Sequence, residues 1–341
     1  MTKNINPFPM IEILRNNQIE SFHYGSGVVV GPGNVSIIEW GDVDKQIFPR
    51  SALKIVQAIP LVESGAASSF ELGAKHLAIA SSSHQGSPIH TNIIKNWLNR
   101  LGLSERHLKC GVQPPSDRFE RQKLKDCGKK PSEIHNNCSG KHLGFLTTIK
   151  HENLNFDYND VDHPLQKKIK MILEELSNET ITNYGIDGCS APNFMCSLRG
   201  LAFAMHSLTD KKTLGISRSK SVEAILLGML SNPLLVAGSG RACSELMSAV
   251  DSPTIVKTGA EGVFVAVIPD KQIGIAVKIL DGATRAAEAA ITLILIRLGV
   301  LNKDHPVVNK RLFCGIRNWS GKLTGYVNPS QSFWDSGKKL I

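Results

Sequence analysis

A serine and a lysine three positions apart carry the chemistry around which this sequence can be interpreted. Ser51 and Lys54 lie in segment 49–54 (PRSALK), where an apolar run begins. In a helix they would share one face, and a partly neutral amine could take the hydroxyl proton and make the serine a nucleophile. The helix dipole would favour an oxyanion above Ser51. A capping serine followed by a surface lysine has the same pattern, so further evidence is needed.

A second serine and a second lysine follow in the order that such chemistry requires. Ser83 lies in a turn of small residues, where it could relay a proton or could simply form part of the turn. Lys257 begins a Lys-Thr-Gly segment at the start of a predicted strand. Serine β-lactamases and penicillin-binding proteins combine a Ser-x-x-Lys nucleophile with a second serine and a Lys-Thr-Gly strand. The order of these parts therefore favours a Ser-Lys hydrolase.

Two cysteine-containing loops form a candidate metal site. Cys138 and Lys141 are three positions apart, and Asp187 precedes Cys189 by two. Lysine is an unusual zinc ligand and no histidine pair completes a standard set, so two buried cysteines remain an alternative. Gly140-Lys141 is not a phosphate-binding loop, because histidine stands where that motif needs its first glycine and its final serine or threonine.

Composition limits the possible partners and location. The chain of 341 residues has a formal charge of +9, but its lysines are scattered without interleaved aromatic residues, which argues against nucleic-acid binding. The N-terminus lacks the apolar core of a signal peptide. The longest apolar segment, 289–301, is too short to span a bilayer. The seven cysteines are odd in number and widely spaced. We therefore expect a cytoplasmic protein with reduced thiols and no membrane association.

Strand patterns lie at the two ends of the chain and helical patterns lie between them. Residues 22–30 and 35–40 predict a hairpin, and a helix is predicted to begin near Ser51 and to end or kink at Pro60. Residues 104–137 are polar and predict an excursion over the surface. Further strands are predicted at 254–259, 263–268 and 273–279. The pattern predicts an α+β fold, with one antiparallel sheet built from N- and C-terminal strands, helices packed on it, and a single domain over 1–341.

The motifs together resemble the thermolabile, Rhizobium etli-type L-asparaginases of the asparaginase II family. The matching segments span almost the whole chain in order. They are Glu20-Ser21 with His23 and Gly25, segment 49–54 with Gln57-Ala58, Ser83-His84 with Gly86 and His90, 137–142 (NCSGKH), 185–192 (GIDGCSAP), 257–264 (KTGAEGVF), and Lys278 with Asp281-Gly282.

The resemblance implies a serine β-lactamase/glutaminase-like fold and hydrolysis of L-asparagine to L-aspartate and ammonia. It implies Ser51 with Lys54 as nucleophile and base, and Ser83 with Lys257 as the second pair. It also implies homodimers and a zinc site that positions substrate rather than supplying the nucleophile. The zinc ligands would be Cys138, Lys141 and Cys189, with Asp187 beside them.

Binding of the substrate's α-carboxylate and α-amine is predicted from residue type. Arginine fits a carboxylate and glutamate fits an ammonium, so the candidates are Arg50, His142, Asp187 and Glu261. Backbone N–H groups near the helix start, together with Thr258-Gly259, are the candidates for holding the oxyanion.

Two departures from the family pattern and two rival functions remain. Ile55 replaces a usual proline, and Ser87 replaces a common acidic residue beside the site, where it could change substrate preference. A β-lactamase or penicillin-binding-type hydrolase would use the same Ser-Lys parts. A non-catalytic, zinc-stabilised binding protein would instead explain the cysteines and the basic charge.

Overall fold

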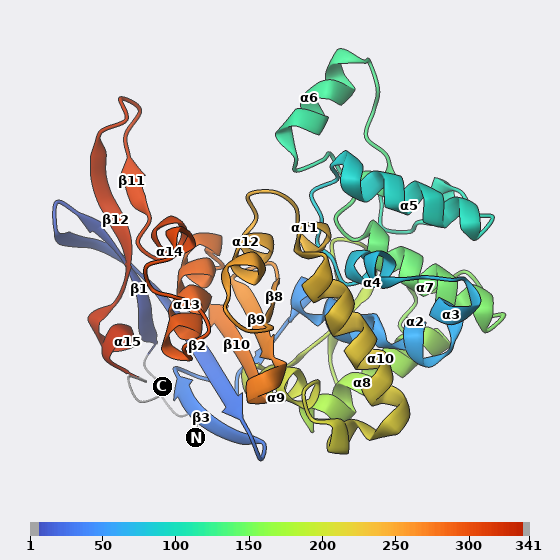
Figure 1. Ribbon diagram of the computed structural model, residues 1–341, viewed down its shortest axis with the longest axis horizontal. Helices are drawn as coiled ribbons and strands as arrows, with labels where there is room; N and C mark the ends of the chain where they lie inside the picture. The colour runs from blue at the N-terminus through green and yellow to red at the C-terminus, as the bar shows by residue number, and fades with distance from the viewer. Residues whose placement is uncertain (1–6, 337–341) are drawn as a thin grey trace.

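A curved antiparallel sheet forms one side of the protein and a group of helices forms the other (Figure 1). The structure is a computed structural model, in which residues 7–336 are described. The sheet has the order β11-β12-β1-β2-β10-β9-β8, with β3 also paired to β2. Its strands are β1 (Phe8–Arg15), β2 (Gln18–Gly31), β3 (Val35–Trp40), β8 (Ile255–Thr258), β9 (Val263–Ile268), β10 (Ile273–Ile279), β11 (Gly315–Arg317) and β12 (Leu323–Pro329).

The central strands are apolar on both faces because helices cover both sides of them. All residues of β9 are buried, and β10 is buried except at Lys278. Helix α9 (Leu198–Ser207) and helix α13 (Thr284–Arg297) both contact these two strands. Strand β8 pairs with β9 so that Lys257 lies opposite Val265. Lys257 is therefore held on a rigid strand at the end of the sheet.

The helical side faces this end of the sheet (Figure 1). The short helix η1 (Arg50–Leu53) contacts β8 and β9, and α1 (Lys54–Gln57) follows it directly. The remaining helices are α2 (Ile59–Glu63), α3 (Ala66–Ser69), α4 (Ala74–Ala80), α5 (Pro88–Arg100), η2 (Glu105–His107), α6 (Arg118–Asp126), η3 (Glu133–His135), α7 (Ser139–His151), α8 (Pro164–Ser177), α10 (Lys211–Ser231), α11 (Pro233–Val236), α12 (Ala242–Ala249), η4 (Pro269–Lys271), α14 (Pro306–Arg311) and α15 (Gln331–Asp335).

Two small strand pairs close the loops near η1. β4 (Gln46–Ile47) pairs with β7 (Cys196–Ser197), and β5 (Tyr184–Ile186) pairs with β6 (Pro192–Phe194). The tight turn between β5 and β6 carries Asp187 and Cys189, and its Asp187 N–H donates to the Ala191 carbonyl at 2.9 Å. This turn fixes the position of one half of the predicted metal site.

The α+β prediction is confirmed, including a sheet whose strands come from both ends of the chain. The helix predicted to begin near Ser51 is instead three short pieces, and Pro60 lies in the first turn of α2 rather than at a helix end. Helix α6 has no buried residue and protrudes from the rest of the protein, in agreement with the surface segment predicted for residues 104–137 (Figure 1). Within residues 7–336, no helix has both the length and the apolar character needed to cross a membrane.

Candidate active site

The backbone immediately before Ser51 is strained and held in place. Arg50 has φ +54°, a left-handed conformation that non-glycine residues rarely adopt and that costs about 1–3 kcal/mol. Its N–H donates to Asn193 Oδ1 at 3.2 Å, and its Nε donates to Asp187 Oδ1 at 2.6 Å. The β5–β6 segment therefore holds the start of η1 and presents Ser51 half-exposed.

The glycine of the Lys-Thr-Gly segment has a steric role beside η1. A Cβ added at Gly259 would lie 2.6 Å from the Pro49 carbonyl oxygen, closer than a side chain can pack. Only glycine allows the segment after β8 to approach the start of η1 this closely. The Gly259 N–H donates to the Val263 carbonyl at 2.7 Å, and the Thr258 N–H donates to Cys243 Sγ at 3.2 Å. Both donors are thus already used, which argues against the predicted Thr258-Gly259 contribution to an oxyanion site.

A buried serine hydroxyl lies between two buried lysines. Ser83 Oγ is 3.2 Å from Lys54 Nζ and 2.8 Å from Lys257 Nζ. Lys54 also donates to the carbonyls of Ser82 at 2.5 Å and Asn137 at 3.0 Å, and Lys257 donates to its neighbour's carbonyl at 2.9 Å. The structure thus brings Lys54, Ser83 and Lys257 into one hydrogen-bonded network. No hydrogen bond from the Ser51 side chain is found within residues 7–336.

The pKa of Lys257 is lowered from its ordinary value of 10.5 to about 7. Burial is the main cause, because it disfavours the charged form, and the positive charge of Lys54 adds to it. An amine with this pKa is half protonated near neutrality and can accept or release a proton.

A pair of neutral histidines supports the loop that carries Ser83. The rings of His84 and His90 stack with their centroids 5.1 Å apart. His84 bonds to Ser139 Oγ at 2.9 Å, and His90 bonds to Ser87 Oγ at 2.7 Å. Burial holds the pKa of both rings low, at about 4 for His90. Ser87, the departure noted in the sequence, therefore serves as a partner for His90.

A small cleft opens at Ser51. Its lining contains Ser51 and Lys54 together with five other polar or charged residues that come from η1–α1, α7 and the β5–β6 segment. The lining residues are Arg50, Ser51, Lys54, Gln57, Lys141, Asp187, Pro192 and Asn193. Gln57 and Asn193 were not predicted as site residues, and the only signal for Gln57 was its place in the family resemblance.

Two predicted substrate-binding residues lie outside this cleft lining. His142 is fully buried in α7, where its Nδ1 bonds to the Tyr158 hydroxyl at 2.9 Å and burial keeps its pKa low. Glu261 is exposed in the turn between β8 and β9, and its carbonyl accepts a hydrogen bond from Lys278. Arg50 and Asp187, in contrast, are paired within the cleft.

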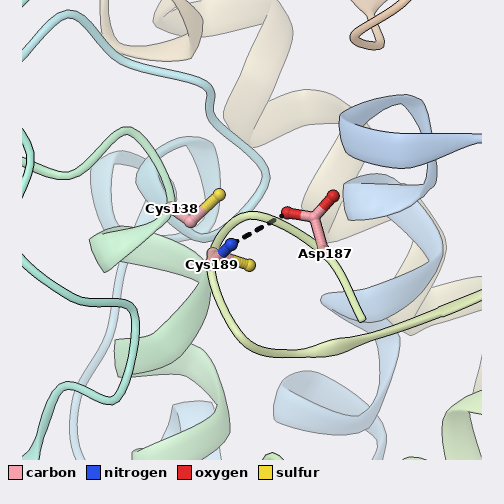
Figure 2. A group of neighbouring side chains, drawn as sticks. All are labelled: Cys138, Asp187 and Cys189. Carbon is pink, nitrogen blue, oxygen red and sulfur yellow. Dashed lines mark hydrogen bonds between the residues drawn. The ribbon is translucent and has the colours of Figure 1, made fainter. Parts of the chain in front are cut away.

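The predicted metal-binding residues come together beside the cleft, whose lining includes Lys141 and Asp187. The Sγ atoms of Cys138 and Cys189 and a carboxylate oxygen of Asp187 all lie within 4.8 Å of one another (Figure 2). Figure 2 also shows the Cys189 N–H donating to Asp187, at 3.2 Å. Lys141 Nζ lies 3.0 Å from Cys189 Sγ. The donors come from the start of α7 and from the β5–β6 turn.

The charges in this cluster favour one thiolate. Hydrogen bonding from Cys138 and the nearby Lys141 charge lower the pKa of Cys189 to about 5, although burial opposes them. Hydrogen bonding to Cys189 and burial raise the pKa of Cys138 to about 12. Burial alone would lower the pKa of Lys141, but the Cys189 thiolate reverses this and raises it. At Asp187, burial would raise the pKa, but the Lys141 and Arg50 charges outweigh burial and lower the pKa to about 2.

This donor set fits zinc. Two sulfur atoms suit a borderline-soft cation, and an amine nitrogen and a carboxylate oxygen are available to complete a four-ligand set. Metal binding would require Cys138 and Lys141 to release their protons, so binding is expected to depend on pH.

The structure is an α+β protein in which a buried hydroxyl lies between two buried amines beside a small cleft. The sequence model described as L-asparaginase II matches residues 11–329. The chain therefore belongs to the L-asparaginase II family. No curated protein sequence matches it.

Several solved structures are similar to the chain at low sequence identity. A beta-lactamase from Mycobacterium bovis is 14% identical, with 80% of this chain and 94% of that chain covered and a TM-score of 0.44. The native form of Mglu is 12% identical, with coverage of 86% and 69% and a TM-score of 0.47. A mutant class C beta-lactamase is 11% identical, with coverage of 82% and 90% and a TM-score of 0.41.

Proposed function

We propose that the protein hydrolyses L-asparagine to L-aspartate and ammonia, with Ser51 as the nucleophile. The observation that carries the proposal is the Ser83 hydroxyl held between Lys54 and Lys257, with Lys54 and Ser51 lining the same small cleft. Membership of the L-asparaginase II family supports a side-chain amide as the bond that is cleaved.

In the proposed mechanism, Ser51 Oγ attacks the side-chain amide carbon and Lys54 takes its proton. Lys54 can do so when one of its own protons passes to Ser83 Oγ, whose proton moves to the neutral amine of Lys257. Catalytic hydrogen bonds such as Ser51–Lys54 often tighten only when substrate is bound. The Ser51 N–H is the proposed oxyanion donor, because the neighbouring Arg50 and Ala52 N–H groups already donate to Asn193 and Pro49.

Breakdown of the tetrahedral intermediate reverses the proton path. Lys257 returns its proton through Ser83 and Lys54 to the leaving nitrogen, so that ammonia departs and an ester joins aspartate to Ser51. Water then attacks this ester while the lysines take its proton. The ester bond breaks, aspartate leaves and Ser51 regains its hydroxyl proton.

Zinc is proposed to bind Cys138, Lys141 and Cys189, with Asp187 beside it. When bound, the cation would polarise or position a substrate group in the cleft and would not supply the nucleophile. Arg50 and Asp187 are the proposed groups for the substrate's α-carboxylate and α-ammonium, because both line the cleft. His142 and Glu261 are not retained in this role. A single domain, a homodimer and a cytoplasmic location stay predictions.

Ammonia release from L-asparagine by the purified protein tests the proposal. Ser51→Ala should lower kcat by at least about a thousandfold, because the covalent path is removed. Ser69→Ala, an exposed serine in α3, is the matched control and should retain full activity. L-Glutamine and a chromogenic β-lactam test the neighbouring substrate classes. Near-full turnover by Ser51→Ala would exclude the covalent mechanism.

A further inference from the structure

Gln57 is a largely buried residue whose side chain reaches the cleft. It is the last residue of α1, three positions after Lys54, so both side chains share a face of the same helical turn. Its side chain lines the cleft with Ser51, and the residue is only 6% exposed. Within residues 7–336 its amide makes no hydrogen bond.

An amide that lines the cleft without a protein partner is available to a ligand there. Its atoms are not among the fully enclosed polar atoms that lack a hydrogen bond, so they are open to the cleft. Apart from the Ser51 hydroxyl, the other polar groups in the cleft lining have partners within the described residues. Arg50 pairs with Asp187, Lys141 lies against Cys189, and Asn193 accepts the Arg50 N–H. The Gln57 amide can therefore form hydrogen bonds with a molecule that occupies the cleft beside Ser51.

The charges around the cleft favour an anionic group as that ligand. Its lining contains the basic residues Arg50, Lys54 and Lys141, and a single carboxylate, that of Asp187. Both oxygens of Asp187 already accept hydrogen bonds, one from Arg50 Nε and the other from the Cys189 N–H. A carboxylate of the substrate would be attracted by the basic residues and could accept from the Gln57 NH₂ group.

We propose that Gln57 Nε2 donates a hydrogen bond to the substrate's α-carboxylate and so selects free amino acids over amides that lack this group. The inference rests on the proposed function, because it assigns one end of the same substrate. Gln57 is a specificity-determining residue in this scheme and takes no part in proton transfer.

Binding to chains that carry Ser51→Ala tests the inference without turnover. Calorimetry would compare L-asparagine with L-asparaginamide, in which a neutral amide replaces the α-carboxylate. The Ser51→Ala chain should bind L-asparagine at least about tenfold more tightly, because hydrogen bonds to charged groups contribute about 1.5–3 kcal/mol. This comparison requires no change at Gln57. Equal affinities would overturn the inference.

Two substitutions then locate the effect at Gln57. Gln57→Met keeps the side-chain size and should weaken L-asparagine binding about tenfold, with less than about threefold effect on L-asparaginamide. Gln57→Glu should weaken L-asparagine binding further, because it opposes one carboxylate with another. If Glu at this position binds L-asparagine as tightly as Gln, the amide does not donate to a carboxylate. Gln122→Met, on the exposed helix α6, is the control.

The same measurements separate this inference from the proposed reaction. Carboxylate-dependent binding without ammonia release by the chain with Ser51 intact would contradict the reaction and support the Gln57 assignment. Ammonia release with an unchanged KM in Gln57→Met would support the reaction and contradict the assignment.

Discussion

Two buried lysines near the candidate site have pKa values that are shifted in opposite directions. Lys257 is fully buried and Lys141 is 4% exposed, so both lose nearly all contact with water. Lys257 lies against the Ser83 hydroxyl and within the field of another cation, and its pKa falls to about 7. Lys141 lies 3.0 Å from the Cys189 sulfur, and its pKa rises.

The difference shows that the neighbouring charge, and not burial alone, decides the protonation state of each amine. Lys257 forms no ion pair with the residues that the structure describes, and its lowered pKa suits it to pass protons near neutral pH. Lys141 remains an ammonium beside the Cys189 thiolate unless a metal ion displaces its proton. The first arrangement is suited to acid–base chemistry and the second to a metal site.

The largest expected effect comes from removing the amine with the lowered pKa. Lys257→Met keeps an unbranched side chain but cannot accept the Ser83 proton. We expect kcat for L-asparagine to fall by about 10² to 10⁴, the usual contribution of a positioned acid–base group. Steady-state kinetics on folded protein measures this. Lys271→Met, in the η4 turn between β9 and β10, is the lysine control. Wild-type kcat in Lys257→Met would show that the second Ser-Lys pair is not part of the proton path.

Loss of the thiolate should remove metal binding rather than proton transfer. Cys189→Ser replaces a sulfur ligand by a poor one, and we expect the zinc content measured by atomic emission to fall from about one ion per chain to near zero. Cys196→Ala alters another fully buried cysteine and should leave the zinc content unchanged. Stoichiometric zinc in Cys189→Ser would mean that the ion binds elsewhere.

Much of the site could be predicted from the sequence because its parts occur in recognisable motifs. Ser51, Lys54, Ser83 and Lys257 are separated along the chain, yet three of them form one network as the order of motifs indicated. Gln57 and Asn193 could not be found in this way, because an amide becomes informative only when its partners, or their absence, are known.

Residue type alone was a weaker guide than motif order. His142 and Glu261 have suitable chemistry, but the orientation of α7 buries the first and the β8–β9 turn exposes the second. In the fold, the hairpin of β2 and β3 and the strands β8 to β10 were predicted from apolar alternation and turns. Strands β1, β11 and β12 were missed, because β1 and β12 are only partly buried and β11 is short and largely exposed.

The smallest expected effect is a pH dependence that belongs to Lys257 alone. As the pH falls from 8 to 6, Lys257 gains a proton in the folded protein, and kcat/KM should fall about tenfold because the neutral amine is depleted.

The lowered pKa of Lys257 should also make the stability of the folded protein depend on pH. Between pH 7 and 10.5 the unfolded chain carries a proton on this amine that the folded chain has released, so stability rises with pH over that interval. Lys257→Met removes the titrating group, so its urea midpoint should exceed that of the wild type by more at pH 6 than at pH 9. A wild-type rate that is flat from pH 6 to 8, or a midpoint difference that does not change with pH, would mean that Lys257 stays charged, and the contrast with Lys141 would then be wrong.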